Sequence, residues 1–253
     1  MDKISVLIYT YNQENEIDEC IDSALQLTSD VVVIDMESTD RTREIASAKG
    51  AKIYTFPHTD YVEPSREFGI SHADSQWIFI LDSDERMTQE LAEEMRENIE
   101  KNTFTYYKVP RKNIFGKKKW LKHGGWWPDM QMRLIKKDSF ISWSKNIHST
   151  PVIKGEIGFL HSPFLHYFHG DIERMVEKTS IFEDIESDLL YKAGRNVKTI
   201  TFFRKYVAEL YRRLLQKMGF MDGTIGIIES IYQAYSKTIT YLFLYEKKNN
   251  RSL

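Results

Sequence analysis

The sequence lacks most of the features that mark secreted, membrane-spanning or nucleic-acid-binding proteins. A single cysteine, Cys20, among 253 residues excludes a disulfide framework and a cysteine-based zinc site. No apolar run approaches the roughly 18 residues that a membrane span needs, and residues 1–10 lack the apolar core of a signal peptide. Lys and Arg (35) nearly balance Asp and Glu (37), so the net charge of −2 gives no general affinity for nucleic acid. These absences predict a cytoplasmic globular protein with no nucleic-acid partner.

The first hundred residues alternate between short buried strands and helices. Continuous apolar, β-branched runs predict strands buried on both faces at 4–10, 31–35, 52–55 and 77–81. Helical spacing and capping residues predict helices at 17–25, 40–49, 64–71 and 88–102. Strands that alternate with helices in this way are typical of a parallel sheet with helices on its faces.

The pattern changes after residue 102. Shorter apolar runs at 105–110, 131–135 and 140–143 predict strands in an antiparallel or mixed extension of the sheet. From residue 171 onward, apolar stripes at 3.6-residue spacing predict helices. The predicted fold class is therefore α/β, a mixed sheet with a parallel first half followed by C-terminal helices. Its predicted parts are a domain over 1–170, with halves 1–102 and 103–170, and a helical extension over 171–253.

Acidic side chains gather at the ends of the predicted strands. Asp35 ends the second strand, and Asp82 and Asp84 follow the fourth. Ligands of parallel sheets bind beyond the carboxyl ends of the strands, and two carboxylates this close suit Mg²⁺ or Mn²⁺, which prefer oxygen ligands. The alternative is that such residues only form turns and helix caps, which explains Asp40 better.

A second cluster combines aromatic rings with a carboxylate. Trp126, Trp127 and Pro128 precede Asp129 in a polar, glycine-containing stretch. Indole rings suit the apolar faces of sugars, and a carboxylate beside them can take a proton from a hydroxyl group. Tryptophans in the core beside a turn-capping aspartate are the alternative, but the combination in a polar loop favours the functional interpretation.

Histidines of the second half are candidates for a metal or phosphate contact. His148 is the best of them, ahead of His166 and His169. Their spacing does not give a clear zinc set. For any one of them, a hydrogen-bonded structural role is the alternative.

Taken in order, these segments resemble the family-two glycosyltransferases with the GT-A fold, and among them the lipopolysaccharide-core β-glucosyltransferases. The resemblance covers most of the chain. It rests on the stretches ISVLIYTYN (4–12), DMESTDRT (35–42), VEPSREFGI (62–70), WIFILDSDE (77–85), PDMQMRL (128–134) and NIH (146–148).

For the donor side, the resemblance implies a nucleotide-diphosphate sugar, with a UDP-hexose expected, and a bound Mn²⁺ or Mg²⁺. Residues 1–102 would be the half that binds it. The implied contacts to base, ribose and diphosphate come from Thr10, Tyr11, Asn12, Asp35, Glu37, Arg66, Asp82 and Ser83. The implied metal ligands are Asp82, Asp84 and His148.

For the acceptor side, the resemblance implies transfer with inversion in a single displacement. Asp129 would be the general base that takes the proton of an acceptor hydroxyl. Residues 103–170 would be the acceptor-side half, with acceptor contacts from Trp126, Trp127, Gln131 and Arg133. The implied acceptor is a glycan or a lipid-linked sugar, as in the synthesis of lipopolysaccharide or another cell-surface polysaccharide.

The C-terminal helices carry basic residues beside apolar and aromatic ones. The basic residues are Arg204, Lys205, Arg212, Arg213 and Lys217. Such a surface suits an anionic membrane and predicts a peripheral contact at the inner face of the membrane. The alternative is that the helices pack together or form a homodimer, with the basic side chains in solvent.

Two other functions stay open at this point. A nucleotidyltransferase-like enzyme also uses an α/β sheet and metal-binding carboxylates, but usually has a glycine-rich signature near its first strand, and residues 8–13 contain no glycine. A non-catalytic carbohydrate-binding protein with a decayed transferase site is the other. The intact Asp82, Asp84 and Asp129 disfavour it.

Overall fold

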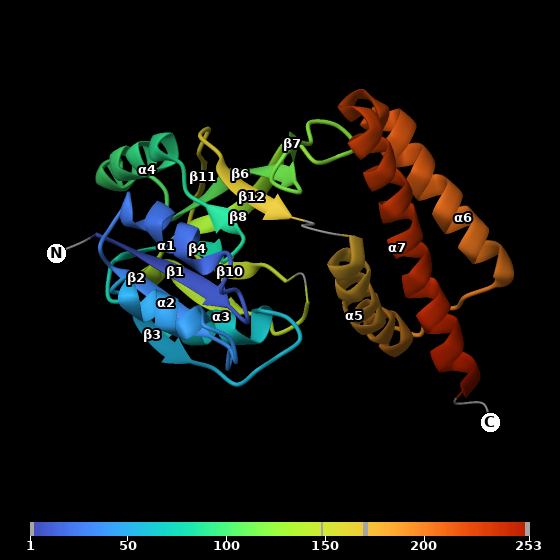
Figure 1. The fold of residues 1–253 in the computed structure, drawn as a ribbon, viewed down its shortest axis with the longest axis horizontal. Helices are drawn as coiled ribbons and strands as arrows, with labels where there is room; N and C mark the ends of the chain where they lie inside the picture. Colours follow the sequence, from blue (N-terminus) through green and yellow to red (C-terminus); the bar gives the residue numbers. More distant parts are fainter. Residues whose placement is uncertain (1–2, 148, 169–171, 251–253) are drawn as a thin grey trace. The chain divides into compact units, whose positions relative to one another are not determined.

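The computed structural model describes residues 3–147, 149–168 and 172–250 (Figure 1). The chain divides into two compact units. The sheet unit contains the described residues of Met1–Lys112 and Asp129–His166, and the helical unit contains those of Asn113–Pro128 and Tyr167–Leu253. The division predicted from the sequence, a domain over 1–170 and a helical extension over 171–253, stays a prediction.

A parallel sheet forms the first half of the sheet unit. Its strands are β1 (Ile4–Thr10), β2 (Val31–Asp35), β3 (Lys52–Thr55) and β4 (Trp77–Asp82). They lie in the order β3-β2-β1-β4, and each pair is parallel. Every residue of β1 and β2 is buried, as expected for strands with helices on both faces. All four predicted strands are confirmed, and β4 is one residue longer than predicted.

Helices connect these strands. They are α1 (Ile17–Leu25), α2 (Thr42–Ala48), α3 (Glu63–Ser71) and α4 (Gln89–Lys101). The Thr88 hydroxyl caps α4 by accepting a hydrogen bond from the Leu91 N–H, and Asp40 Oδ1 accepts one from the Thr42 N–H at the start of α2. The capping residues read from the sequence therefore act as expected, and the helix boundaries agree with the prediction to within two residues.

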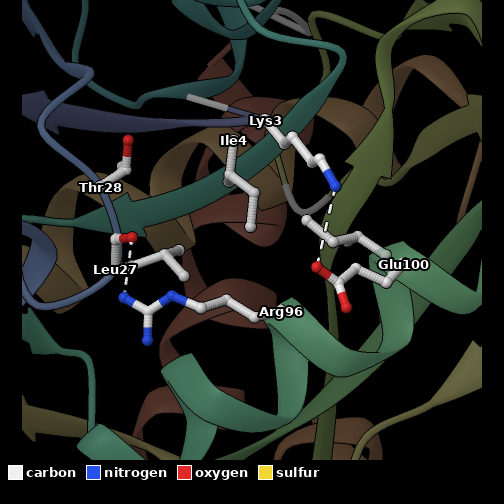
Figure 2. A pocket seen from close by; sticks show the side chains of 7 residues that line it. Lys3, Ile4, Leu27, Thr28, Arg96 and Glu100 are labelled. Atoms are coloured by element: carbon white, nitrogen blue, oxygen red, sulfur yellow. Dashed lines mark hydrogen bonds and ion pairs between the residues drawn. The ribbon is translucent and has the colours of Figure 1, made fainter. Parts of the chain in front are cut away.

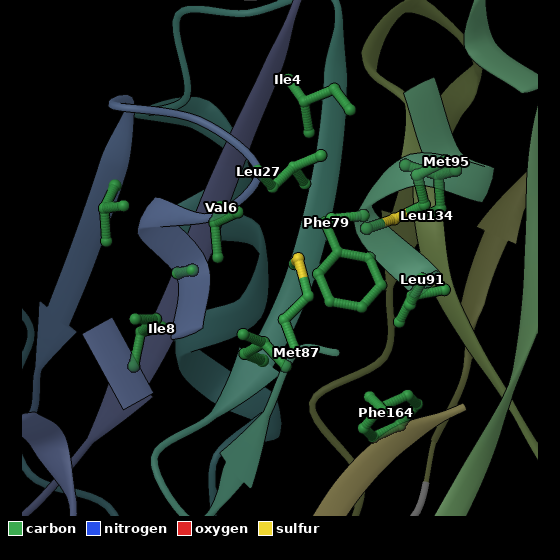
Figure 3. Close-up of a cluster of buried hydrophobic side chains, with 14 of the residues drawn as sticks. Ile4, Val6, Ile8, Leu27, Phe79, Met87, Leu91, Met95, Leu134 and Phe164 are labelled. Atoms are coloured by element: carbon green, nitrogen blue, oxygen red, sulfur yellow. The ribbon is translucent and has the colours of Figure 1, made fainter. Parts of the chain in front are cut away.

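Alternate residues of the strands enter two separate hydrophobic clusters. Ile8 belongs to the cluster that includes Ile21 of α1 and Leu91 of α4 (Figure 3). Leu7 belongs to the other, with Ile70 of α3. Full burial of a large apolar side chain is worth about 1.5–3 kcal/mol. The two clusters therefore fix the sheet and, with it, the edge at which the carboxyl ends of β1, β2 and β4 meet.

A mostly antiparallel extension continues the sheet beyond β4 in the order β4-β8-β6-β12-β5, with β11 beside β6. Its strands are β5 (Glu85–Arg86), β6 (Tyr106–Phe115), β8 (Asp129–Lys136), β11 (Ile157–Phe159) and β12 (Phe164–Phe168). A separate hairpin follows a 3₁₀ turn and consists of η1 (Lys137–Ser139), β9 (Phe140–Trp143) and β10 (Pro151–Ile153). Because β6 and β8 pair with each other as far as Arg111 and Asp129, both are longer than predicted. Asp129 therefore begins a strand and does not lie in a loop.

The helical unit consists of three long helices, two short helical turns and a short strand. These are α5 (Ile172–Lys192), α6 (Thr199–Leu210), the π-helical turn η2 (Tyr211–Gln216), the 3₁₀ turn η3 (Gly219–Asp222), α7 (Gly223–Asn250) and β7 (Lys119–Trp120). α7 packs against both α5 and α6 (Figure 1). β7 pairs with the last residues of β6. None of the helices described is long and apolar enough to cross a bilayer.

One acidic side chain is buried in the middle of this unit. Glu229 of α7 is 1% exposed. Burial raises its pKa to about 7, against the lowering effects of a hydrogen bond with Gln233 and of the charge of Arg213. The folded helical unit therefore binds this proton more tightly than the unfolded chain does.

We predict that Glu229→Gln removes a pH dependence of stability. Because the pKa is raised in the folded state, the carboxyl favours folding below about pH 4.5, and this contribution is lost as the pH rises through about 7. Relative to the variant, the wild type should lose up to about 3 kcal/mol between pH 5 and pH 8. Urea unfolding followed by circular dichroism at several pH values measures this difference. If the free energy of unfolding changed equally with pH in the wild type and the variant, the prediction would be wrong.

Candidate active site

Two buried polar groups meet at the carboxyl ends of β1 and β2. Thr10 and Asp35 lie opposite each other in the strand register, and they are 2% and 0% exposed. Asp35 Oδ2 accepts a hydrogen bond of 3.1 Å from the Ser38 N–H, whereas Asp35 Oδ1 and Thr10 Oγ1 have no partner in the described part of the chain. A buried polar atom without a partner costs free energy. These two atoms therefore mark a place where a ligand can supply the missing hydrogen bonds.

The turns beyond these strands are tied to one another. Asn12 has a φ of 50°, and its Oδ1 accepts a hydrogen bond of 2.8 Å from the Thr39 N–H. Glu37 has a φ of 61°, and its Oε2 accepts one of 3.2 Å from the His58 N–H. The ring centroids of Tyr11 and His58 are 3.9 Å apart. The predicted donor-side residues of these turns therefore lie in one connected group.

Arg66 reaches this edge from α3. Gly69 allows the helix to approach β1, because a Cβ there would clash with the Tyr9 hydroxyl, and that hydroxyl donates a hydrogen bond of 2.9 Å to the Arg66 carbonyl. The Arg66 guanidinium lies 4.4 Å from the Tyr9 ring centroid and 5.5 Å from that of Trp143. It donates 2.8 Å to Asp82 Oδ1. Its Nε and Nη1 have no partner among the described residues, so this buried cation has donors left for an anionic ligand.

Asp82 and Glu85 share a second buried arginine. Arg133 Nη2 donates 2.9 Å to Asp82 Oδ2 and 2.7 Å to Glu85 Oε1. Burial alone would raise the pKa of Asp82, but the charges of Arg66 and Arg133 outweigh it and hold that pKa well below its usual range. Burial raises the pKa of Glu85 in spite of Arg133. Burial would lower the pKa of Arg133, but the charges of Glu85 and Asp82 raise it, so this guanidinium is a permanent cation between the two carboxyl groups.

The predicted general base is joined to this cluster through one more arginine. Arg111 Nε donates 2.8 Å to Asp129 Oδ2, and its Nη1 lies 3.6 Å from Glu85 Oε1. Gln131 Nε2 donates 2.5 Å to Asp129 Oδ1. Arginines and carboxylates therefore alternate without a break from Arg66 to Asp129. Four successive ion pairs, through Arg133, Glu85 and Arg111, thus connect Asp82 to Asp129.

Arg133 and Ser83 lie deeper than the sequence suggested. Arg133 is 6% exposed and Ser83 7%. Arg133 holds the carboxyl groups of Asp82 and Glu85 together, and a direct contact with the acceptor stays a prediction for it. Ser83 presents its carbonyl, which accepts a hydrogen bond of 2.8 Å from Arg86 Nη1.

Asp84 is the candidate ligand for a divalent cation at this edge. In the described ranges, no group of three or more His, Cys, Asp or Glu side chains is arranged to hold a metal ion, and both oxygens of Asp82 accept hydrogen bonds from arginines. Asp84 has a side chain 30% exposed, and its Oδ2 lies 3.7 Å from His166 Nε2. Mg²⁺ is commonly held by one or two carboxylates together with substrate phosphates, so this donor set suits a cation that binds with a diphosphate. His148 and His169 lie outside the described residues.

The two predicted acceptor-side tryptophans belong to the helical unit. The ring of Trp126 lies 4.8 Å from that of Phe168, and the ring of Trp127 lies 5.4 Å from that of Trp120, edge to face. Both tryptophans are partly exposed. They form an aromatic surface of that unit, and their contact with an acceptor stays a prediction.

The roles of Glu85 and Arg111 could not be predicted from the sequence. Glu85 follows the Asp82–Asp84 pair, and nothing in its local pattern distinguishes a buried carboxyl from a solvated one. Arg111 lies in a run of basic residues whose pattern is typical of a solvent-exposed loop. Its role can be recognised only from the pairing of β6 with β8, which places Arg111 opposite Asp129. The one sequence feature that could have pointed to these roles is the group of three carboxyl residues after β4, because buried carboxylates need cationic partners.

A pocket of about 220 Å³ lies at the amino end of β1, away from this edge (Figure 2). It is lined by Lys3, Ile4, Leu27, Thr28, Arg96, Ile99 and Glu100. Its charged groups already have protein partners: Arg96 Nη2 donates 2.9 Å to the Leu27 carbonyl, and Lys3 Nζ lies 3.8 Å from Glu100 Oε1. None of these described lining residues has a buried side-chain polar atom without a partner, in contrast to Thr10, Asp35 and Arg66 at the carboxyl edge.

Comparison with known proteins decides the family. A family model described as glycosyl transferase family 2 matches residues 5–163. The chain belongs to this family. Uncharacterised glycosyltransferases of Rickettsia typhi and Rickettsia prowazekii are each 26% identical to it over 256 residues, which cover 94% of this chain and 85% of each relative. The protein is thus a glycosyltransferase, whereas the lipopolysaccharide-core subgroup stays a prediction.

Solved structures support the fold. Glucosyl-3-phosphoglycerate synthase from Mycobacterium tuberculosis, in complex with phosphoglyceric acid, has a TM-score of 0.51 at 13% identity and covers 77% of this chain and 81% of its own. The same enzyme with Mn²⁺ and UDP-glucose has a TM-score of 0.50 at 14% identity, with 77% and 80% covered. At these identities the likeness concerns the fold alone. It agrees with the expected GT-A class, a mixed sheet with a parallel first half and C-terminal helices.

We predict that Arg133→Met lowers the stability of this glycosyltransferase by about 3–5 kcal/mol, because it leaves two buried carboxyl groups without their shared cation. Urea unfolding at neutral pH measures the loss. Arg41→Met is the matched control, since Arg41 pairs with Glu44 on the exposed surface, and its effect should be small. Equal losses in the two variants would rule out the buried network as the source.

Proposed function

We propose that this family 2 glycosyltransferase transfers a hexose from a UDP-sugar to a hydroxyl group of a glycan or a lipid-linked sugar, with inversion at the anomeric carbon. The observation that carries the proposal is the unbroken chain of arginines and carboxylates from Arg66 to Asp129. At one end of this series, Arg66 is suited to bind a diphosphate. At the other end, Asp129 is suited to accept a proton. Lipopolysaccharide and other cell-surface polysaccharides are the acceptor classes we favour, with the enzyme at the inner face of the membrane.

The donor would bind at the carboxyl ends of β1 and β2. The unpartnered Asp35 Oδ1 and Thr10 Oγ1 suit the hydrogen-bonding groups of a base and a ribose. The free Nε and Nη1 of Arg66 suit a phosphate oxygen, for which a planar guanidinium is well shaped. The UDP-glucose complex of the structural neighbour supports the same donor class.

A divalent cation would be held by Asp84, with His166 beside it and donor phosphate oxygens completing its shell. When bound, it supplies positive charge that stabilises the departing nucleoside diphosphate. Arg66 adds a fixed positive charge to the same end of the site, and Asp82 orients Arg66 through their 2.8 Å hydrogen bond. The Mn²⁺ named in the neighbour's complex supports this choice of ion.

Asp129 would act as the general base. Its Oδ1 and Oδ2 accept hydrogen bonds from Gln131 and Arg111, which fix the direction of the carboxylate. The acceptor hydroxyl oxygen forms a bond to the anomeric carbon while its proton passes to Asp129. The bond from that carbon to the diphosphate breaks, and its electron pair leaves with the nucleoside diphosphate. A single displacement of this kind inverts the anomeric configuration.

We predict that Asp129→Asn lowers the transfer rate by about 10²–10⁴-fold, which is the usual contribution of a general base, while donor binding is retained. A radiolabelled-sugar transfer assay measures the rate, and calorimetry with UDP-glucose and Mn²⁺ measures binding. Asp138→Asn, an exposed aspartate on η1, is the control that should keep both. An Asp129→Asn enzyme with normal transfer would disprove the assigned role.

We predict that Asp84→Asn weakens the response to Mn²⁺. In the wild type, removal of divalent cations with a chelator should abolish transfer, and added Mn²⁺ should restore it. In the variant, restoration should need at least about tenfold more Mn²⁺, because one charged ligand is lost. An unchanged titration curve in a variant that melts at the wild-type temperature would exclude Asp84 as a ligand.

A further inference from the structure

An apolar stripe runs along the exposed side of α6 and its π-helical turn. The stripe consists of Ile200, Phe203, Val207, Tyr211 and Leu215, which are 67%, 67%, 62%, 60% and 54% exposed. Their spacing of three or four residues places them on one side of the helix. The stripe continues beyond the turn through Met218, Phe220 and Met221, each about half exposed.

A second exposed stripe lies on α7. It consists of Ile228, Ile231, Tyr235, Leu242 and Tyr245, which are between 39% and 49% exposed. α7 packs against α5 and α6, and its Ala234 and Leu244 are fully buried. The ring of Tyr245 also lies 5.9 Å from that of Phe202 on α6. Two neighbouring helices thus each present apolar and aromatic side chains to solvent, an amount that marks an interaction surface. We call the two stripes together the docking surface.

Basic residues outnumber acidic ones along the docking surface, and the exposed Glu246 lies beside Tyr245 at its end. Residues 192–245 contain nine basic residues and three acidic ones. None of the three acidic side chains is exposed: Asp222 and Glu229 are 5% and 1% exposed, and Glu209 pairs with Arg212 and Arg213. The exposed basic residues are Lys192, Arg195, Lys198, Arg204 and Lys217.

This pairing of features identifies one kind of occupant. A spanning helix is excluded for the described helices. A second copy of the surface would bring its exposed positive charges against an identical set, which is unfavourable. An apolar, aromatic stripe flanked by Lys and Arg is the composition of helices that lie in the interface of anionic bilayers. We propose that the helical unit docks on an anionic lipid surface through α6, its π-helical turn and α7.

The predicted acceptor-side loop is fastened to the same unit. Asp222 Oδ2 accepts hydrogen bonds of 2.8 Å and 2.7 Å from the Lys122 and His123 N–H groups. Arg213 Nη1 donates 3.1 Å to the Gly124 carbonyl, and its guanidinium lies 5.5 Å from the Trp126 ring centroid. Docking would therefore hold the tryptophan loop at the bilayer. Insofar as the proposed function is right, this favours an acceptor that is carried in the membrane.

Co-sedimentation with vesicles tests the docking without donor or acceptor, so its result does not depend on the proposed function. The full chain should bind phosphatidylcholine vesicles that contain phosphatidylglycerol, and should be released as salt is raised. Arg204→Glu with Lys217→Glu should weaken binding by about thirtyfold, from about 1 kcal/mol per basic residue at a charged surface. Phe203→Ser with Val207→Ser should weaken it by at least about tenfold.

The matched control combines Ile141→Ser and Lys154→Glu, two exposed positions of the sheet unit, and should bind as the wild type does. All variants are checked by thermal unfolding, and light scattering gives their oligomeric state. No binding by the wild type, or equal binding by all variants, would overturn the proposal. A wild-type dimer that the Phe203 and Val207 variant dissociates, without vesicle binding, would assign the docking surface to a second copy and also overturn it.

Discussion

Buried charge is the constraint around which the sheet unit is organised. Glu85 is fully buried, and Asp82 lies beside it with both oxygens engaged. A carboxylate without a cation in such a place is costly, and Arg133 of β8 reduces that cost for both. Since side chains alternate across a strand, a slip of β8 by one residue would turn Arg133 to the opposite face. The pairing of Arg133 with the two carboxyl groups thus favours the observed register of β8 over a register shifted by one residue.

The same arrangement makes the site rigid before any substrate arrives. Arg66 is held by Asp82 and by the rings of Tyr9 and Trp143. Asp129 is held by Arg111 and Gln131 at the other end. Groups that are oriented in advance stabilise developing charge without having to reorganise during the reaction. The free energy of folding holds these groups in place, so the stability of the sheet unit and the reaction proposed for it depend on the same ion pairs.

The sequence was sufficient for the local structure and for the carboxyl edge. Continuous apolar runs located β1 to β4, and Asp35, Asp82 and Asp84 were assigned to the edge because parallel strands end there. Long-range pairing could not be read in the same way. The length of β8, and hence the position of Asp129 on a strand opposite Arg111, depends on a partner strand that lies far away in the sequence.

Burial was the other property that local patterns concealed. Glu85 and Arg133 look like ordinary charged residues in the sequence, yet they are 0% and 6% exposed. Arg212 and Arg213 were expected to face a membrane; both pair with Glu209, and their contact with a membrane stays a prediction. In each case the charged side chain forms an ion pair that was not predicted from the sequence.

The single cysteine has a practical consequence. Cys20 of α1 is completely buried, its Sγ lies 3.6 Å from the Asp82 carbonyl, to which it donates, and burial raises the pKa of its thiol. A protonated, inaccessible sulfur reacts poorly with maleimides and nitroxide reagents. Two cysteines introduced on the surface, one in the sheet unit and one in the helical unit, would therefore take spectroscopic labels while Cys20 stays unlabelled. The distance between the two units then becomes measurable.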